Sequence, residues 1–338
     1  MSRRIVLLLA LLACANLLLL AVAQAASGTD APGTIVAVVD SGVSPHPSLD
    51  GRLLDALDLV RPGGTARDTS GHGTAVAALV AEGCPRCSIL PVRVLDGNRA
   101  APWARIADGI VAAVEAGARV VNVSIAGPGG SPELRAAIEH AAAHDVLVVA
   151  AAGNTGSAVR EFPAAYPQVV AVAATDGAGT LHDWSARGAW ADVRAAGCAA
   201  VPVGNASAWA CGTSFAAPRV TAAAALARGA APAASAVEIA AALPRTLPAE
   251  VAAPRIEVRG LPRPGATVHA SAAGVEPGLG AAIRWFRCDG AACRPVGGAT
   301  YRVSAADAGA TLVARVVTKP FGGLWLAASE PLPVAARG

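Results

Sequence analysis

The chain has 338 residues, which is long enough for two domains of ordinary size. With 54% hydrophobic residues, 15% charged residues and 36 glycines, it can bury a core, so extensive disorder is excluded. The aromatic share of 4% predicts a core built mostly from Ala, Val and Leu. A formal charge of +3 gives no reason to expect nucleic acid as a partner.

The first segment has the pattern of an export signal. Arg3 and Arg4 precede an almost unbroken apolar run over residues 5–22, and small residues follow at 23–25. This order of a basic, an apolar and a small-residue region is typical of a signal peptide, which we predict over residues 1–25. The protein is then secreted or periplasmic. The apolar run is also long enough to remain as an uncleaved membrane anchor, which is the alternative.

Six cysteines remain once the predicted signal, which contains Cys14, is removed. An even number of cysteines in an exported chain predicts three disulfides, although six cysteines allow many pairings. The segment at residues 84–87 also fits a redox dithiol, but no thioredoxin-like unit surrounds it, so a structural disulfide is favoured. Nearness in sequence favours Cys84 with Cys87, Cys198 with Cys211, and Cys288 with Cys293.

Between residues 34 and 228, short β-branched or apolar runs alternate with alanine-rich stretches of helical pattern. The alanine-rich stretch at residues 132–143 has Ser131 as N-cap and Pro132 at its first helical position. The alternation predicts an α/β fold in which a parallel sheet is flanked by helices on both faces. The predicted strands cover residues 34–39, 88–93, 120–123, 146–150 and 169–173, and the predicted helices cover 74–81, 104–116 and 132–143.

Beyond residue 228 the composition changes. A short helical pattern over residues 234–243 leads into a Pro-rich linker at 244–254, which we take as the boundary of a first domain at 26–243. Residues 255–338 contain strand-like runs separated by Gly and Pro, which predict a small all-β sandwich. This last part carries 10 basic and 5 acidic residues, net +5, whereas the chain between it and the signal carries 15 basic and 19 acidic residues, net −4.

Three polar residues stand at predicted strand and helix ends. Asp40 ends the first strand, and His72 and Ser214 each open a helix. In an α/β sheet these positions converge on one edge, where sites form. A hydroxyl group is a poor nucleophile at neutral pH, so it needs a base within hydrogen-bond reach and an acid that orients the base. Each residue alone also fits an ordinary cap or turn, but together they fit a catalytic triad better.

The motifs around these residues resemble those of the subtilisin-like serine proteases. They are Asp-Ser-Gly at residues 40–42, Gly-His-Gly-Thr at 71–74 and Gly-Thr-Ser-Phe-Ala-Ala-Pro at 212–218, in that family's order of Asp, His and Ser. The resemblance spans about residues 34–226. It implies a subtilisin-like fold and a serine endopeptidase whose partners are protein or peptide substrates.

The same resemblance implies how substrate is held. A fourth element, Ala-Ala-Gly-Asn, includes Gly153 and places the side-chain amide of Asn154 in the oxyanion hole. A further segment resembles the one that pairs with extended substrate as an added strand. In this segment Ala126 stands where many relatives have Gly, so its methyl group narrows the primary pocket. The segment consists of Ser124, Ile125, Ala126 and Gly127.

Glu161 precedes Phe162-Pro163, which aligns with the family segment that forms the floor of the primary pocket. Pro163 stands in the place of a cis-proline of that family. The residue before the aromatic-Pro pair faces the pocket in the family, and a carboxylate there pairs with Arg or Lys of the substrate. We therefore predict cleavage after a basic residue. The alternative is an ordinary solvated loop glutamate.

Three features depart from the family pattern. Residues 26–33 alone separate the predicted signal from the first strand, which leaves no room for the folding pro-domain of many relatives. Ser48 stands where many relatives have a calcium-binding Asp, so we expect neither a metal nor a cofactor. Residues 255–338 are extra to the catalytic unit and resemble the immunoglobulin-like modules of bacterial surface proteins, with a basic charge that predicts contact with anionic cell-envelope polymers. We expect a monomeric enzyme; the competing hypothesis is a catalytically silent surface-binding protein that keeps the protease fold.

Overall fold

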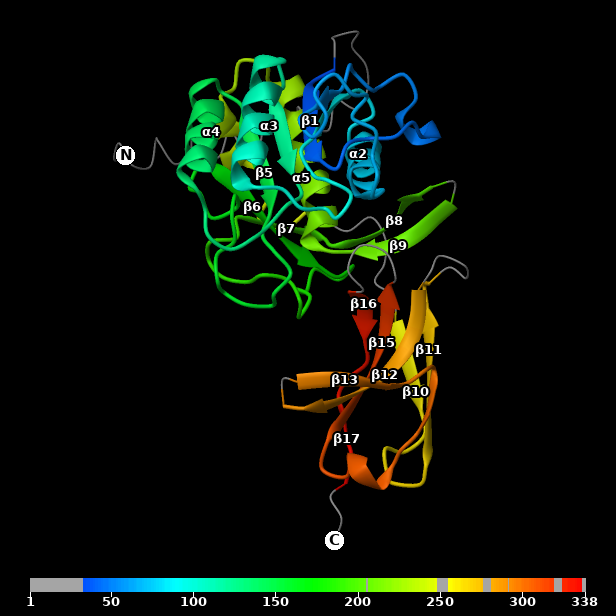
Figure 1. The fold of residues 1–338 in the computed structure, drawn as a ribbon. Helices are drawn as coiled ribbons and strands as arrows, with labels where there is room; N and C mark the ends of the chain where they lie inside the picture. The colour runs from blue at the N-terminus through cyan, green and yellow to red at the C-terminus, as the bar shows by residue number, and fades with distance from the viewer. Residues whose placement is uncertain are drawn as a thin grey trace, which may run out of the picture.

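A computed structural model describes residues 33–204, 206–247, 255–275, 281–290, 292–318 and 324–335. The predicted signal peptide and most of the predicted linker lie outside these residues. Within the described part of the chain, no helix combines the length and the apolar character needed to cross a membrane. The molecule has two parts, an α/β domain and, below it in Figure 1, a domain of β-strands.

The α/β domain is built on a seven-stranded sheet of order β2-β3-β1-β4-β5-β6-β7, in which all neighbouring strands are parallel. Its central strands consist mainly of apolar residues, most of them Val and Ala, because both of their faces are buried. The chain passes from one side of β1 to the other between β3 and β4, so the carboxyl ends of β1 and β4 form a switch point, where sites lie in such sheets. The strands are β1 (Ile35–Asp40), β2 (Leu57–Asp58), β3 (Ser88–Arg93), β4 (Val120–Val123), β5 (Leu147–Ala151), β6 (Val169–Thr175) and β7 (Val193–Ala196).

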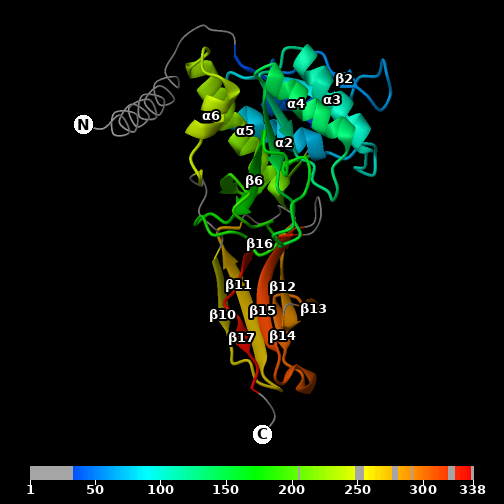
Figure 2. The ribbon, with the colours of Figure 1, turned by 90° about the vertical axis from the view of Figure 1, so that its left-hand side faces the viewer.

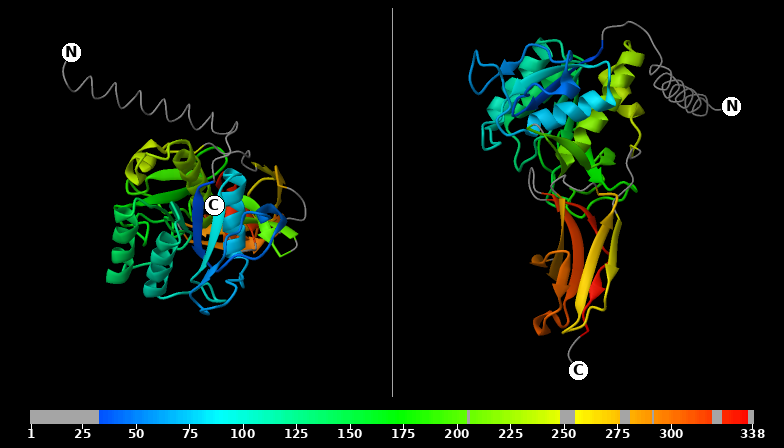
Figure 3. Two further views of the ribbon diagram at one scale, coloured as in Figure 1. Left: turned by 90° about the horizontal axis from the view of Figure 1, so that it is seen from above. Right: turned by 90° about the vertical axis from the view of Figure 1, so that its right-hand side faces the viewer.

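Helices cover both faces of the sheet (Figure 2 and Figure 3). On one face, α3 and α4 bury Ile110 and Ile138 against the strands. On the other face, α2, α5 and α6 bury side chains such as Val80, Val220 and Ile239. The helices are η1 (Pro47–Leu49), α2 (His72–Gly83), α3 (Trp103–Glu115), α4 (Pro132–Ala143), α5 (Thr213–Ala230) and α6 (Ala236–Ala242).

A β-hairpin leads into the helix that carries Ser214. It consists of β8 (Cys198–Val203) and β9 (Ala206–Cys211), which pair antiparallel, and a disulfide closes its open end. Because Gly212 and α5 follow Cys211 directly, the first turn of α5 begins next to the disulfide, at the end of the hairpin opposite to its turn. The described residues contain three disulfides, with the pairing that nearness in sequence favours: Cys84–Cys87, Cys198–Cys211 and Cys288–Cys293.

The C-terminal domain is a sandwich of two antiparallel sheets. One has the order β10-β11-β14, and the other has the order β13-β12-β15-β16, with β17 beside β15. The core lies around Trp285, which is fully buried with Val268 and Leu312. The predicted fold class, a parallel sheet flanked by helices and followed by an all-β domain, is confirmed. The elements are β10 (Arg255–Arg259), β11 (Thr267–Ala273), β12 (Ala281–Asp289), β13 (Ala292–Gly297), β14 (Thr300–Arg302), η2 (Ala305–Asp307), β15 (Thr311–Thr318), β16 (Trp325–Ala328) and β17 (Leu332–Pro333).

The two domains are in contact. The indole Nε1 of Trp184 donates a hydrogen bond of 3.1 Å to the backbone oxygen of Trp325, and the buried side chain of Leu326 joins the hydrophobic cluster of the α/β domain. The first residues of the predicted linker also stay beside the sheet, because the Leu247 N–H donates to the backbone oxygen of Arg194 at 2.8 Å. The β-domain is therefore packed against the α/β domain and shares part of its core.

Candidate active site

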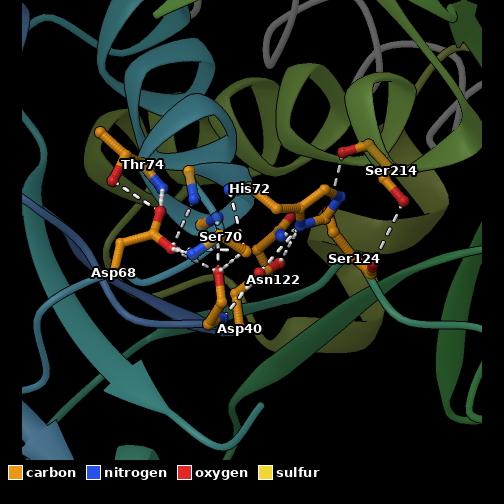
Figure 4. Close-up of polar contacts among 11 residues, drawn as sticks. Asp40, Asp68, Ser70, His72, Thr74, Asn122, Ser124 and Ser214 are labelled. Carbon is orange, nitrogen blue, oxygen red and sulfur yellow. Dashed lines mark hydrogen bonds and ion pairs between the residues drawn. The ribbon is translucent and has the colours of Figure 1, made fainter. Parts of the chain in front are cut away.

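Asp40 and His72 form a hydrogen-bonded pair at the carboxyl edge of the sheet. Asp40 is the last residue of β1 and is fully buried, and His72 is the first residue of α2. The Nδ1 atom of His72 lies 2.8 Å from Oδ1 and 3.0 Å from Oδ2 of Asp40. An ionised carboxylate only accepts hydrogen bonds, so we assign the proton to Nδ1. Figure 4 shows the imidazole between Asp40 on one side and Ser214 on the other.

Asp68 holds the start of α2 in place (Figure 4). Its Oδ1 accepts hydrogen bonds from the backbone N–H groups of Ser70 and Gly71 at 2.9 and 2.8 Å. Its Oδ2 accepts from the backbone N–H and the hydroxyl of Thr74 at 2.8 and 2.7 Å. A carboxylate at a helix N-terminus satisfies the free N–H groups and interacts favourably with the helix dipole. The position of His72 at the start of α2 therefore depends on Asp68, a role that the sequence reasoning missed.

Ser41 links this helix start back to β1. Its hydroxyl donates to Oδ1 of Asp68 at 2.9 Å and accepts from the Gly73 N–H at 3.0 Å. The two segments approach so closely that a Cβ atom at Gly73 would lie 2.1 Å from the backbone oxygen of Gly42. The third residue of the Gly-His-Gly-Thr motif, Gly73, must therefore be glycine for β1 and α2 to lie this close together, and this closeness sets the distance between Asp40 and the imidazole.

Ser214 lies in the first turn of α5 and is linked to the segment after β4. Its hydroxyl donates to the backbone oxygen of Ser124 at 3.1 Å, and the Ser124 hydroxyl donates to the backbone oxygen of Ser214 at 2.9 Å. The side-chain amide of Asn122 donates to Ser124 Oγ at 3.0 Å, and the Thr221 hydroxyl donates to Asn122 Oδ1 at 2.9 Å. Asn122 and Thr221 are fully buried, so this chain of hydrogen bonds fixes α5 against β4.

Asn154 is oriented by Thr213, the residue before Ser214. Its Oδ1 accepts from the backbone N–H of Thr213 at 2.9 Å and from the Thr213 hydroxyl at 3.1 Å. A backbone N–H only donates, so the atom that faces it is the carbonyl oxygen, and the Nδ2 group of Asn154 is left for the pocket. Gly153 has a φ of 107°, which glycine adopts without strain, and its N–H donates to the Thr213 hydroxyl at 3.1 Å.

Glu161 lies behind Gly153. The backbones of Phe162 and Gly127 exchange hydrogen bonds of 2.8 and 3.1 Å, which hold the predicted substrate segment beside Glu161. The Glu161 residue is 9% exposed, and a Cβ atom at Gly153 would lie 2.4 Å from its Oε1. The Thr155 hydroxyl donates to Oε1 at 3.2 Å. Across the described residues, no basic side chain forms an ion pair with Glu161, and its burial argues against a solvated loop side chain.

Most of the predicted site residues meet at one open pocket, and Asp40 lies behind His72. Among the described residues, one cluster of metal-ligating side chains is present, Glu115 with His140 and His144, and it lies at the ends of α3 and α4 and not in this pocket. The predicted residues that line the pocket are His72, Ser124, Ile125, Ala126, Asn154 and Ser214.

Comparison with known proteins identifies the family. The model of the Subtilase family, peptidase S8, matches residues 31–273, which is more than half of the chain. The chain belongs to the subtilase family. This subtilase is 36% identical over 210 residues to thermitase of Thermoactinomyces vulgaris, which covers 58% of this chain and 75% of the relative. It is 38% identical over 201 residues to a thermophilic serine proteinase of Bacillus sp. (strain AK1), which covers 56% of this chain and 50% of the relative.

The fold of this subtilase is also similar to a solved structure. The crystal structure of a cold adapted subtilisin-like serine proteinase matches with a TM-score of 0.57 and 26% identity, covering 63% of this chain and 82% of that chain. The Phe162–Pro163 peptide is cis, as the resemblance implies. Together with the family match, these relatives show that the chain is a serine endopeptidase with protein or peptide substrates.

Proposed function

We propose that Ser214, His72, Asp40 and Asn154 carry out the peptide hydrolysis of this subtilase. The Ser214 hydroxyl attacks the scissile carbonyl carbon while its proton passes to Nε2 of His72. Asp40 keeps the imidazole in the tautomer with a proton on Nδ1 and stabilises the imidazolium. The oxyanion accepts hydrogen bonds from Nδ2 of Asn154 and the backbone N–H of Ser214. His72 then gives its proton to the leaving amine, and water hydrolyses the acyl-enzyme by the same steps.

The observation that carries this proposal is the pairing of a buried carboxylate with a pocket-lining histidine, at 2.8 Å between Asp40 Oδ1 and His72 Nδ1. The hydrogen bond from the Ser214 hydroxyl to the backbone oxygen of Ser124 fits the same mechanism. A substrate strand that pairs with residues 124–127 competes for that oxygen and leaves the hydroxyl to His72. Substrate binding and activation of the nucleophile are then coupled.

The test is covalent labelling by a fluorophosphonate probe, which reacts with an activated serine. We expect the protein to be labelled at Ser214, Ser214→Ala to be unlabelled, and His72→Ala to react at least about 10³-fold more slowly. Ser207→Ala removes an exposed hydroxyl of the nearby hairpin and should change nothing. A folded wild-type protein that resists the probe would contradict the triad and favour a catalytically silent surface-binding protein.

We propose further that Glu161 selects a basic residue before the scissile bond. Its carboxylate is buried behind Gly153, beside the proposed oxyanion residue Asn154, and finds no cation among the described residues. An unpaired buried carboxylate is unfavourable, and an Arg or Lys side chain of the substrate supplies the missing charge. The Ala126 methyl group lines the pocket that also holds Asn154 and Ser214, so it narrows that pocket and disfavours broad aromatic side chains of the substrate.

Peptides that differ only in Arg, Leu or Ala before the scissile bond test this assignment. Glu161→Gln keeps the shape of the side chain and removes its charge, so kcat/KM for the Arg peptide should fall by about 10- to 100-fold while the Leu peptide is unaffected. Glu139→Gln, an exposed change on α4, serves as the control. A preference for Leu that survives both Glu161→Gln and Glu161→Ala would remove Glu161 from the specificity of the enzyme.

We propose that residues 1–25 direct export of the protein. Mass spectrometry of the secreted protein should find an N-terminus at Ala26; an intact first segment in the membrane fraction would support the membrane anchor instead.

We also propose that the mature enzyme is a monomer and that the net charge of +5 on residues 255–338 attaches it to anionic envelope polymers. Binding to a purified anionic cell-wall polymer should disappear at raised salt. Light scattering should report the mass of one chain, and a dimer mass would contradict the monomer.

A further inference from the structure

Glu115, His140 and His144 bring three metal-ligating groups together on the surface of the α/β domain. Glu115 is the last residue of α3, His140 lies in the last turn of α4, and His144 is the C-cap of α4. One ligand atom from each lies within 4.8 Å of the other two. Because α3 and α4 lead back to the amino ends of β4 and β5, the cluster lies at the sheet edge opposite to the catalytic residues.

The two histidines are arranged as metal-binding histidines usually are. They are four residues apart, so they share a helix face, and their ring centroids are 4.1 Å apart. Nδ1 of His144 lies 2.8 Å from the backbone oxygen of His140, and a carbonyl only accepts, so Nδ1 carries the proton and the Nε2 lone pair is left for a ligand. A backbone carbonyl that fixes the tautomer in this way is the typical outer partner of a metal-bound imidazole.

Glu115 supplies the oxygen ligand from the neighbouring helix. Its Oε1 accepts a hydrogen bond of 3.0 Å from Nε2 of His140, and a bound ion takes the place of the proton between these two atoms. The Glu115 side chain is 64% exposed and that of His140 is 30% exposed, so an ion reaches them from solvent and small rotations suffice to bind it. Both helices end here, and the negative end of each helix dipole favours a cation.

We propose that Glu115, His140 and His144 bind a zinc ion, with water as the fourth ligand. Imidazole nitrogen suits zinc, whereas calcium prefers ligand sets made of oxygen alone. The ion joins the ends of α3 and α4, which lead into β4 and β5, the strands that precede Ser124 and Asn154. The site stabilises the support of the pocket without touching substrate, because an ion that binds only the folded chain raises Tm.

Calorimetry on the full chain, without an affinity tag, tests the site. The background is Ser214→Ala, which stops self-digestion and separates this result from any outcome of the catalytic assays. After removal of metals by a chelator, zinc should bind with one ion per chain, and His140→Ala and His144→Ala should each weaken binding at least about tenfold. His269→Ala, an exposed histidine of the β-domain, should leave binding unchanged.

Two further readouts exclude loose surface binding. Cobalt in place of zinc should give the visible absorption of a four-coordinate site, and Glu115→Gln should change that spectrum. Saturating zinc should raise Tm by about 2 °C or more, and this rise should vanish in the variant with His140→Ala and His144→Ala combined. Absence of saturable binding, or zinc binding and a Tm rise that persist in the combined variant, would overturn the proposal.

Discussion

The two domains each bury an aspartate, and they use it differently. Asp40 of the α/β domain is fully buried and bonds to Nδ1 of His72, a titratable group that lines the pocket. Asp307 of the β-domain is 2% exposed and accepts hydrogen bonds from the Tyr301 hydroxyl at 2.7 Å and from the N–H and hydroxyl of Ser304, both at 2.8 Å. The partners of Asp307 hold the turn between β14 and β15, and neither Tyr301 nor Ser304 lines the pocket beside His72.

This difference shows what identifies a functional carboxylate. Burial raises the pKa of Asp307, but the hydrogen bonds from Tyr301 and Ser304 and the charge of Arg287 outweigh burial and hold that pKa below its ordinary value. A buried carboxylate that accepts several hydrogen bonds is therefore a structural element in one domain and part of the proposed triad in the other. What distinguishes Asp40 from Asp307 is a titratable neighbour, His72, that lines a pocket. Substitutions of the two aspartates test this distinction.

Asp40→Asn should have the largest effect. An asparagine amide donates to Nδ1 of His72 and so favours the tautomer with the proton on Nε2, which cannot accept the Ser214 proton. We expect kcat to fall about 10⁴-fold while Tm changes little, because the volume and most of the packing are kept. Steady-state kinetics and a thermal melt measure both quantities; a decrease in kcat below tenfold would show that Asp40 acts like Asp307.

Asn154→Ala removes the proposed oxyanion donor and should have the next largest effect. The expected fall in kcat is about 10²- to 10³-fold with little change in KM, because the oxyanion exists only in the transition state. The comparison variant is Asn154→Asp, which keeps an acceptor for the Thr213 N–H but replaces the donor with an oxygen. It should lose at least as much activity as Asn154→Ala, and a near-normal kcat in it would leave the Nδ2 group without a role.

The sequence predicted the elements whose signals are local. The expected ranges 88–93, 120–123 and 132–143 agree with β3, β4 and α4, because turn residues bound the strands and Ser131 caps the helix through a bond of 3.2 Å to the Leu134 N–H. The residues of the proposed triad were predicted for the same reason, since each stands in a short motif at an element end. The hairpin of β8 and β9 was not predicted, because its residues show no clear alternation of apolar and polar side chains.

The residues that support the site depend on contacts distant in sequence. Asn122 and Thr221 are 99 residues apart, and each alone reads as an isolated polar residue in an apolar run. One signal was available: a polar side chain in the middle of a buried strand requires a partner. The proposed zinc site is a similar case, because the spacing of His140 and His144 is visible in the sequence, whereas Glu115 comes 25 residues before His140 and joins them only after folding.

His182 makes stability at the domain contact depend on pH. Burial against Trp184, with ring centroids 4.4 Å apart, lowers the pKa of His182 from 6.5 to about 4, although Asp176 and Asp183 oppose this shift. The unfolded chain therefore binds a proton that the folded chain does not bind between these pH values. The contribution of neutral His182 to the free energy of unfolding is complete above pH 6.5. It is lost as pH falls toward 4, by up to about 3 kcal/mol in total.

Urea unfolding of the Ser214→Ala chain at several pH values between 7 and 4 measures this dependence. His182→Phe keeps an aromatic ring against Trp184 and cannot be protonated, so its stability should fall less steeply over the same window. Carboxylates titrate in both proteins and cancel in the difference. Parallel curves for the two proteins would show that His182 does not contribute.

Asp307→Asn should have the smallest effect and one opposite in kind to that of Asp40→Asn. The asparagine amide places an N–H donor opposite either the Ser304 N–H or the Tyr301 hydroxyl, so at least one charge-assisted hydrogen bond is lost. The free energy of unfolding should fall by about 2 kcal/mol. Tyr301→Phe removes a single bond and should lose about half as much. Because the proposed triad is in the other domain, kcat should stay at the wild-type value in both variants. A tenfold loss of kcat with an unchanged Tm would mean that the β-domain carboxylate also serves catalysis, and the distinction between the two aspartates would fail.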